Sequence, residues 1–488
     1  MIRSATLSAL LLLTLALLPG CFFDVGEAPE AAAASSCERY VGPFDDPNAL
    51  RMGAVFGLSG PSPELGVRSL NALTLATDQI NAISGGVGGL QSARPLAFQV
   101  CDDQGNPDHA VLVANYLADT LGPAAIIGPA QSRSFLPVAE EVTIPRGIVG
   151  MSASATAVDI SALDDNDLIW RTAPPDTNQP NALAYFAYWQ LLRASALSGA
   201  PDVRVALINS DDAYGQGFAD TFKTSLSALA GQNLNISFVP LAYSGDDTAA
   251  VTQAGQDAIA ALPLDAALLV GAEETADVLA VLTTDEGAGL RDVPFFMPDG
   301  TRSSRLRTLF SSEDEKPRML FGVNPAFRVG EVFDAFEAAY TETYNADPDT
   351  WTEHVYDAVY ILAIAASGID GEPTGAAVAE QLMRLNDTND GRAVNLVPDD
   401  LVAAFNEMAT PDGSLDVTGA SGPLDFDNSV GEPVSAGILR WDVQPGTQRI
   451  RECGLASIYF SDNSIQHFWC NARCMPDQPD GCVPPNAP

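Results

Sequence analysis

The feature that most restricts the fold of this chain is a regular alternation of short apolar runs with longer amphipathic stretches. From residue 51 onward, the runs have the length of β-strands and the stretches have the length and periodicity of helices. In the stretch 64–83, the residues that share one face at helical spacing are Leu70, Leu73, Ala76, Thr77 and Ile80. Because a parallel sheet with crossover helices produces this alternation, we expect an α/β fold.

The alternation occurs twice, which predicts two sheets. The first series predicts strands at 52–57, 96–100, 124–127 and 148–151, with helices at 64–83, 107–121 and 134–142. After the Pro174-Pro175 break, the second series predicts strands at 203–209, 236–240, 266–270 and 294–297. Two doubly wound units in one chain form two lobes with a cleft between them.

The C-terminal part of the chain has a different rhythm. We expect helices at 333–344, 351–367 and 376–385, then short strands near 422–426 and 436–441. If these late strands return to the second lobe, the chain crosses between the lobes more than once and forms a hinge. We therefore assign 51–172 and 326–418 to lobe 1, and 173–325 and 419–450 to lobe 2.

The N-terminus has the layout of an export signal, with Arg3 before an apolar run over 5–18. The run is shorter than the roughly 20 apolar residues of a membrane-spanning helix, so cleavage is favoured over a permanent anchor. Leu18-Pro19-Gly20-Cys21 resembles the lipobox of bacterial lipoproteins, although Pro19 is unusual there, and implies a lipid on Cys21. We expect a signal peptide over 1–21 and a tether and lead-in over 22–50, flexible over 22–36. This predicts a lipoprotein of the periplasm or cell envelope, on either the inner or the outer membrane.

Six cysteines follow Cys21, and an even number in an exported chain indicates disulfides. Zinc is the alternative for the four in the tail, where His467 lies nearby, but their spacing is not that of a standard finger and the compartment is oxidising. We expect residues 451–488 to form a small disulfide-clamped appendix, and we expect no metal or cofactor. The cysteines, whose pairing stays open, are Cys37, Cys101, Cys453, Cys470, Cys474 and Cys482.

The charge balance excludes one class of partner. Asp and Glu total 63 against 24 Lys and Arg, a formal net charge of -39. Such a surface repels nucleic-acid phosphates, so we expect no nucleic-acid binding and interpret the charge as a solvated acidic surface.

Small hydroxyl residues follow two neighbouring predicted strands. Ser132 and Ser134 come after 124–127, and Ser152, Ser154 and Thr156 come after 148–151. Ligands of open parallel sheets bind beyond the carboxyl ends of the strands, where such N–H and O–H groups suit a carboxylate. Ordinary helix capping explains the same residues, so both interpretations stand.

An ordered set of short motifs extends from residue 51 to about 445. It comprises Gly57-Leu-Ser-Gly-Pro61, Asp78-Gln-Ile-Asn81, Gly85-Gly86, Asp102-Asp103, Asn106-Pro107, Ile127-Gly128-Pro129, Arg171-Thr172, Tyr214-Gly215-Gln216-Gly217, Asp299-Gly300 and Tyr356-Asp357-Ala358. Together with the hydroxyl turns, the set resembles the branched-chain amino acid-binding family of ABC-transporter receptors. This resemblance implies the type I periplasmic binding protein fold.

The resemblance also implies a ligand held by its α-amino and α-carboxyl groups. The residues that would receive the carboxylate are Ser132, Ser154, Ala155 and Thr156. Asp299 would pair with the ammonium and Tyr214 would close over the ligand, although a turn role for Asp299 and a packing role for Tyr214 fit equally well. Where the family often has an aromatic residue, this chain has Ala272-Glu273-Glu274. A carboxylate there favours a polar or cationic ligand, or stabilises a helix N-terminus, so a branched aliphatic ligand is not assumed.

The sequence contains little that would support catalysis. It has no His-Glu-x-x-His, no Gly-x-Ser-x-Gly and no lysine placed as in a phosphate loop. We therefore expect a solute-binding protein that delivers its ligand to an ABC permease and catalyses nothing. A ligand-sensing or structural envelope lipoprotein, and a hydrolase with a dispersed site, are the alternatives.

Overall fold

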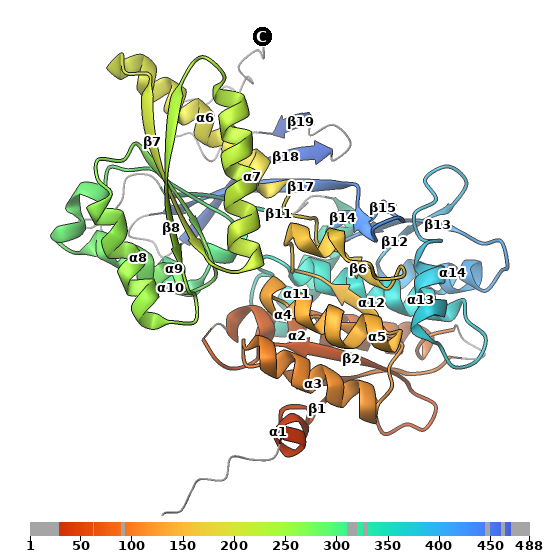
Figure 1. Ribbon diagram of the computed structural model, residues 1–488. Coiled ribbons are helices and arrows are strands. Elements are labelled where there is room, and N and C mark those ends of the chain that lie inside the picture. Colours follow the sequence, from red (N-terminus) through yellow and green to blue (C-terminus); the bar gives the residue numbers. More distant parts are fainter. Residues whose placement is uncertain are drawn as a thin grey trace, which may run out of the picture.

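The computed structural model describes residues 29–61, 63–88, 93–309, 320–325, 330–444, 449–459 and 464–469. Within these residues the chain forms two α/β lobes, each built on its own large sheet (Figure 1). Lobe 1 combines the red and orange N-terminal elements with the cyan helices of the C-terminal half. Lobe 2 combines the yellow-green and green elements with blue strands that come later in the chain. The α/β class predicted from the alternation is confirmed.

Lobe 1 is built on a six-stranded sheet. Its strands are Arg39–Val41 (β1), Leu50–Phe56 (β2), Leu96–Asp102 (β3), Ala125–Ile127 (β4), Val149–Ser152 (β5) and Ile169–Arg171 (β6). They lie in the order β1-β3-β2-β4-β5-β6; all run parallel except β1, which pairs antiparallel with β3. β2 and β3 are almost wholly buried, as a continuous apolar run in a parallel sheet requires. β6 was not predicted as a strand: it ends in the charged Arg171 and so lacks the continuous apolar run of the equally short β4.

Helices from two distant parts of the chain cover this sheet. They are Pro63–Ser84 (α2), Pro107–Thr120 (α3), Ser132–Val138 (α4) and Ile144–Arg146 (α5), then Glu331–Tyr344 (α11), Thr352–Ser367 (α12), Gly375–Leu382 (α13) and Pro398–Met408 (α14). Successive residues of β2 face opposite ways: Ala54 and Phe56 pack into the core shared with α2 and α12, whereas Val55 packs against α3. The core that joins α2 to α12 therefore places these late helices in lobe 1.

Lobe 2 is built on an eight-stranded sheet. Its strands are Asp202–Ser210 (β7), Asn235–Tyr243 (β8), Ala266–Val270 (β9), Phe295–Met297 (β10), Leu320–Pro325 (β11), Ser435–Gln444 (β17), Arg449–Tyr459 (β18) and Ser464–Trp469 (β19). They lie in the order β19-β18-β17-β11-β10-β9-β7-β8, with β7 to β11 parallel and β17 to β19 antiparallel. The helices are Gln179–Ser198 (α6), Ala213–Ala230 (α7), Thr248–Ala260 (α8), Thr275–Leu279 (α9) and Ser304–Leu309 (α10).

Within the described chain, the polypeptide passes between the lobes after β6, after β11 and again before β17. Residues 419–433, which the sequence assigns to lobe 2, instead pack in lobe 1. Phe426 stacks edge-on against Trp170 with ring centroids 5.4 Å apart. The buried Asp357 of α12 accepts the backbone N–H groups of Ala420 and Ser421, each at 2.8 Å. The return to lobe 2 therefore begins only at β17.

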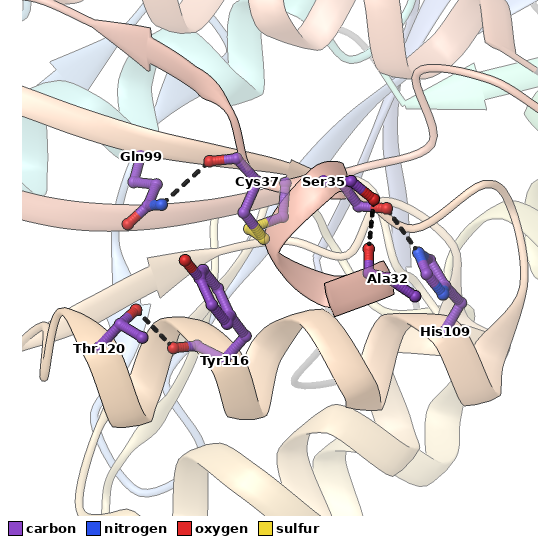
Figure 2. Close-up of a disulfide and its surroundings, with 9 residues drawn as sticks. Ala32, Ser35, Cys37, Gln99, His109, Tyr116 and Thr120 are labelled. Carbon is purple, nitrogen blue, oxygen red and sulfur yellow. Dashed lines mark hydrogen bonds between the residues drawn. A yellow bond between two sulfur atoms is a disulfide. The ribbon is translucent and has the colours of Figure 1, made fainter. Parts of the chain in front are cut away.

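The N-terminal end of the described chain is packed against lobe 1, contrary to the predicted flexible tether. Pro29–Ser36 forms helix α1, whose alanines favour helix and whose Ala33 is buried beside α3. Cys37 and Cys101 form a disulfide (Figure 2), and Gln99 Nε2 donates to the Cys37 carbonyl at 3.0 Å. Residues 22–28 of the tether and Cys21 lie outside the described residues.

The predicted C-terminal appendix is, over its first part, an extension of the lobe 2 sheet. β18 pairs with β17, and β19 pairs with β18. Cys453 lies in β18, whereas Cys470, Cys474 and Cys482 lie outside the described residues. Among the helices in the described part, none combines the length and apolar character needed to cross a bilayer.

Candidate functional site

A cavity of about 90 Å³ lies at the boundary of the two lobes. Lobe 1 contributes the turns that follow β4 and β5 and one side of α2. Lobe 2 contributes the loops that follow β7, β9 and β10. These loops leave the carboxyl ends of parallel strands, which is where open α/β sheets bind ligands.

The lobe 1 wall carries three buried hydroxyl residues, Ser132, Ser154 and Thr156, and all three line the cavity. Ser132 Oγ accepts the backbone N–H groups of Thr156 and Ala157, each at 3.1 Å, and so ties the two turns together. Ser154 Oγ donates to the Ala130 carbonyl at 2.8 Å. The wall is thus a rigid surface, because each hydroxyl already bonds a neighbouring group.

The turn after β4 needs glycine at one position. Gly128 has φ of +87°, a left-handed conformation that side-chain-bearing residues rarely adopt. A Cβ at this position would lie 2.2 Å from the Val55 carbonyl oxygen. The tight approach to β2 sets the direction in which the chain leaves the strand toward Ser132.

Ala155 does not reach the cavity wall, contrary to the prediction. Its side chain is fully buried in a cluster that contains Phe135 and Ile169, and its N–H donates to Ser152 Oγ at 2.9 Å. In the turn Ser154-Ala155-Thr156, the first and third residues line the cavity, whereas the middle residue packs into lobe 1. Ala155 therefore supports the turn from behind.

The main acidic group of the lobe 2 wall is Asp299, which is 8% exposed. Its Oδ1 accepts hydrogen bonds from Gln179 Nε2 at 2.8 Å and from the Tyr214 hydroxyl at 3.1 Å. Its Oδ2 accepts from Trp351 Nε1 at 2.9 Å. Burial raises the pKa of Asp299, while these three hydrogen bonds to the carboxylate act in the opposite direction.

Trp351 connects the two walls. It precedes α12 in lobe 1, and its indole crosses the boundary to reach Asp299 in lobe 2. Its backbone lies in the left-handed region at φ +77°, which is uncommon for a bulky residue and costs about 1–3 kcal/mol. Such strain is typical of a position that a functional site requires.

A second buried carboxylate lies behind the first. Asp176 is 1% exposed; its Oδ2 accepts the Thr156 hydroxyl at 2.7 Å, and its Oδ1 lies 3.5 Å from Gln179 Nε2. Burial raises the pKa of Asp176 well above its usual range, and the charge of Asp299 raises it further. The nearby Arg171 already pairs with Glu432. Two acidic side chains therefore lie buried close together on this side of the site, with Arg171 as the cation that acts on Asp176.

Direct contacts across the boundary hold the lobes together around the cavity. Glu64 of α2 accepts the backbone N–H of Ser304 at 3.1 Å and also accepts its hydroxyl. Arg133 forms an ion pair with Asp246. Arg302 pairs with Asp349 at 3.2 Å. The structure therefore shows the lobes in contact rather than apart.

The cavity brings together most of the residues predicted for the site. Ser132, Ser154, Thr156, Tyr214 and Asp299 all line it. Sequence reasoning missed Trp351, which also lines it, and the supporting pair Asp176 and Gln179. For Asp176 a signal was available, because it follows the Pro174-Pro175 break at which the chain changes lobe; Trp351 has no such local signal.

Two α/β lobes with a polar cavity at their boundary form an architecture suited to binding a small ligand. A family model for periplasmic binding proteins matches residues 49–413, and the chain belongs to this family. The family consists of solute-binding proteins, not enzymes. The resemblance drawn from the ordered motifs is thereby confirmed.

The relatives and solved structures agree with this assignment. The Leu/Ile/Val-binding protein BraC3 of Rhizobium johnstonii is 30% identical over 179 residues, which cover 37% of this chain and 44% of that protein. The Leu/Ile/Val-binding protein homolog 3 of Brucella melitensis is 24% identical over 338 residues, which cover 68% of this chain and 83% of that protein. LivJ of Streptococcus pneumoniae, solved with isoleucine, has a TM-score of 0.60 at 19% identity and covers 83% of this chain and 98% of its own. This likeness confirms the type I fold.

Proposed function

We propose that this protein captures an amino-acid-like zwitterion between its lobes and delivers it to an ABC permease. The proposal depends on one observation: the cavity has hydroxyls on its lobe 1 wall and a buried carboxylate on its lobe 2 wall. A zwitterion carries a carboxylate and an ammonium group a short distance apart. Each end of such a ligand therefore finds a group of suitable chemistry on the opposing walls.

At the carboxylate end, Ser132 is the main donor. Its Oγ accepts two backbone N–H groups, which leaves its own hydrogen free to point into the cavity. The hydrogens of Ser154 and Thr156 are used in bonds to the Ala130 carbonyl and to Asp176. Thr156 can contribute if its hydroxyl rotates away from Asp176, and Ser154 shapes the wall.

At the ammonium end, Asp299 is the counter-ion and Tyr214 covers it. Burying two carboxylates close together is unfavourable, because each raises the energy of the other's charged form. A ligand ammonium placed at Asp299 would supply the missing positive charge. Lobe closure would then depend on the ligand, since only a ligand that binds the closed state better shifts the population toward it.

The relatives support a small ligand of this class. The relatives named as Leu/Ile/Val-binding proteins and the solved LivJ complex with isoleucine support an amino acid. LivJ is described as the substrate-binding protein of a branched-chain amino acid transporter, which supports delivery to a permease. A lipid on Cys21 would keep the receptor beside that permease.

Matched ligands test the capture step on the purified full chain. The set consists of an amino acid, the carboxylic acid that lacks its α-amino group, and the amine that lacks its carboxylate, each followed by thermal shift. A ligand that binds only the folded state raises the melting temperature, so we expect a shift with the amino acid alone. A panel of aliphatic, polar and aromatic amino acids then finds the best ligand. An equal shift with the acid that lacks the amino group would remove the ammonium role of Asp299.

Transport and anchoring need separate measurements. Uptake of the isotope-labelled ligand should fall in cells that lack this gene and return when the gene is restored. Cys21→Ser should release the protein from the membrane fraction without changing its affinity for the ligand. Normal uptake without the gene would favour a sensing role.

A further inference from the structure

Two adjacent glutamates on the loop after β9 differ in their surroundings. Glu274 Oε1 accepts the Tyr243 hydroxyl at 3.1 Å and the backbone N–H of Ala272 at 2.9 Å, so this carboxylate holds the loop in shape. Glu273 lines the cavity and is 8% exposed. Within the described part of the chain, no cation forms an ion pair with Glu273. Its carboxylate accepts one hydrogen bond, from the backbone of Glu64, and this bond by itself acts to lower the pKa of Glu273.

Charged groups of both signs lie around Glu273. Burial and then the nearby Glu64 raise the pKa of Glu273 to about 7, whereas Arg68 and Arg305 lower it. Arg305 lies 2.6 Å from Asp277, whereas Arg68 shares Asp349 with Arg302 and Arg307. Glu273 therefore faces the cavity near these cations without forming an ion pair with Arg68 or Arg305.

The position of Glu273 differs from that of Asp299. The charged groups that act on Glu273 come from α2 and α10. The groups that bond Asp299 are Gln179, Tyr214 and Trp351. The cavity therefore presents a second acidic subsite, apart from the one assigned to the α-ammonium.

We propose that Glu273 binds a positively charged group on the ligand side chain, and that the ligand is a diamino acid. This inference rests on the proposed function, which orients the α-carboxylate and α-ammonium. An unpaired buried carboxylate is costly, and a side-chain ammonium would form a charge-assisted hydrogen bond with it.

Ornithine and norleucine provide a matched pair of ligands. They have the same number of non-hydrogen atoms and differ only in the terminal group, which is an ammonium in one and a methyl in the other. Isothermal titration calorimetry on the full chain should show ornithine binding at least about tenfold more tightly. Glu273→Gln should abolish this preference by weakening ornithine while norleucine stays within about twofold. Glu286→Gln, which removes an exposed charge of lobe 2 outside the cavity, should preserve the preference.

The outcomes separate this inference from the proposed function. Tighter binding of norleucine than of ornithine by the wild-type chain would overturn the cationic subsite and leave amino-acid capture intact. Equal weakening of both ligands by Glu273→Gln would also overturn it, because a structural role does not distinguish the two. If neither of these ligands nor any other amino acid binds, the proposed function itself fails. The wild-type comparison needs no variant, so a poorly folding Glu273→Gln does not prevent the test.

Discussion

The two walls of the cavity satisfy their polar groups in different ways. On the lobe 1 wall, Ser132, Ser154 and Thr156 each bond a backbone group or a side chain of the same lobe or its flanking segment. On the lobe 2 wall, Asp299 is held by neutral donors, and Glu273 has no cation partner in the described chain. Burying a bonded hydroxyl costs little, whereas burying an uncompensated carboxylate costs several kcal/mol. The lobe 2 wall should therefore decide affinity and selectivity, and the lobe 1 wall should decide ligand orientation.

The largest effect is expected from Asp299→Asn. Losing the counter-ion of a buried ammonium costs about 3 kcal/mol or more, which weakens amino-acid binding at least about 100-fold. Titration calorimetry measures the loss. Asp220→Asn, which removes an exposed carboxylate of α7 outside the cavity, is the matched control and should change affinity little. Equal affinity of Asp299→Asn and the wild type would contradict the ammonium assignment.

A smaller effect is expected from Ser132→Ala on the opposite wall. A hydrogen bond to a charged group contributes about 2 kcal/mol, so affinity should fall roughly thirtyfold. The same variant leaves the Thr156 and Ala157 N–H groups without their acceptor and should also lower the melting temperature. Measuring both quantities separates the two roles. A lower melting temperature with unchanged affinity would make Ser132 a support of the turn alone.

The acidic subsite should make ornithine binding depend on pH. The pKa of Glu273 is raised to about 7, with Glu64 and Arg68 of α2 and Arg305 of α10 as the charged groups that act on it. The carboxylate form binds the cation, so affinity should increase as pH rises, by about tenfold from one unit below this pKa to one unit above. The ligand's side-chain amine stays protonated across this window. Norleucine should show no such increase, and a parallel increase for both ligands would point to another titrating group.

The smallest effect is expected from Tyr243→Phe, a change behind the acidic subsite. Tyr243→Phe removes the hydroxyl that bonds Glu274 and the Val270 carbonyl. The free energy of unfolding should fall by about 1 kcal/mol, measured by urea titration. The ratio of ornithine to norleucine affinity should stay constant, because Glu274 supports the loop and Glu273 makes the contact. A changed ratio would mean that the two glutamates act together.

The sequence predicted much of both sheets and several residues of the cavity for the same reason. Strand and helix periodicity are properties of neighbouring residues, so they can be recognised without knowledge of the fold. Ser132, Thr156 and Asp299 could be found because they follow strands, and the carboxyl edge of a parallel sheet is where ligands bind. β6 was missed because it ends in the charged Arg171 and lacks a continuous apolar run. Residues 29–36 were interpreted as a tether because an alanine-rich segment shows no sign that Ala33 will be buried by α3.

What the sequence determined by itself is the set of elements and the polar turns that end them. Tertiary structure alone decided that Trp351 reaches Asp299, that Asp176 lies behind it, and that residues 419–433 pack in lobe 1. It also decided that Glu273 faces the cavity while Glu274 bonds Tyr243. The reason is that these contacts join segments far apart in the chain. They form only when the crossings between the lobes bring those segments together. No local pattern of residues indicates which distant segments will meet.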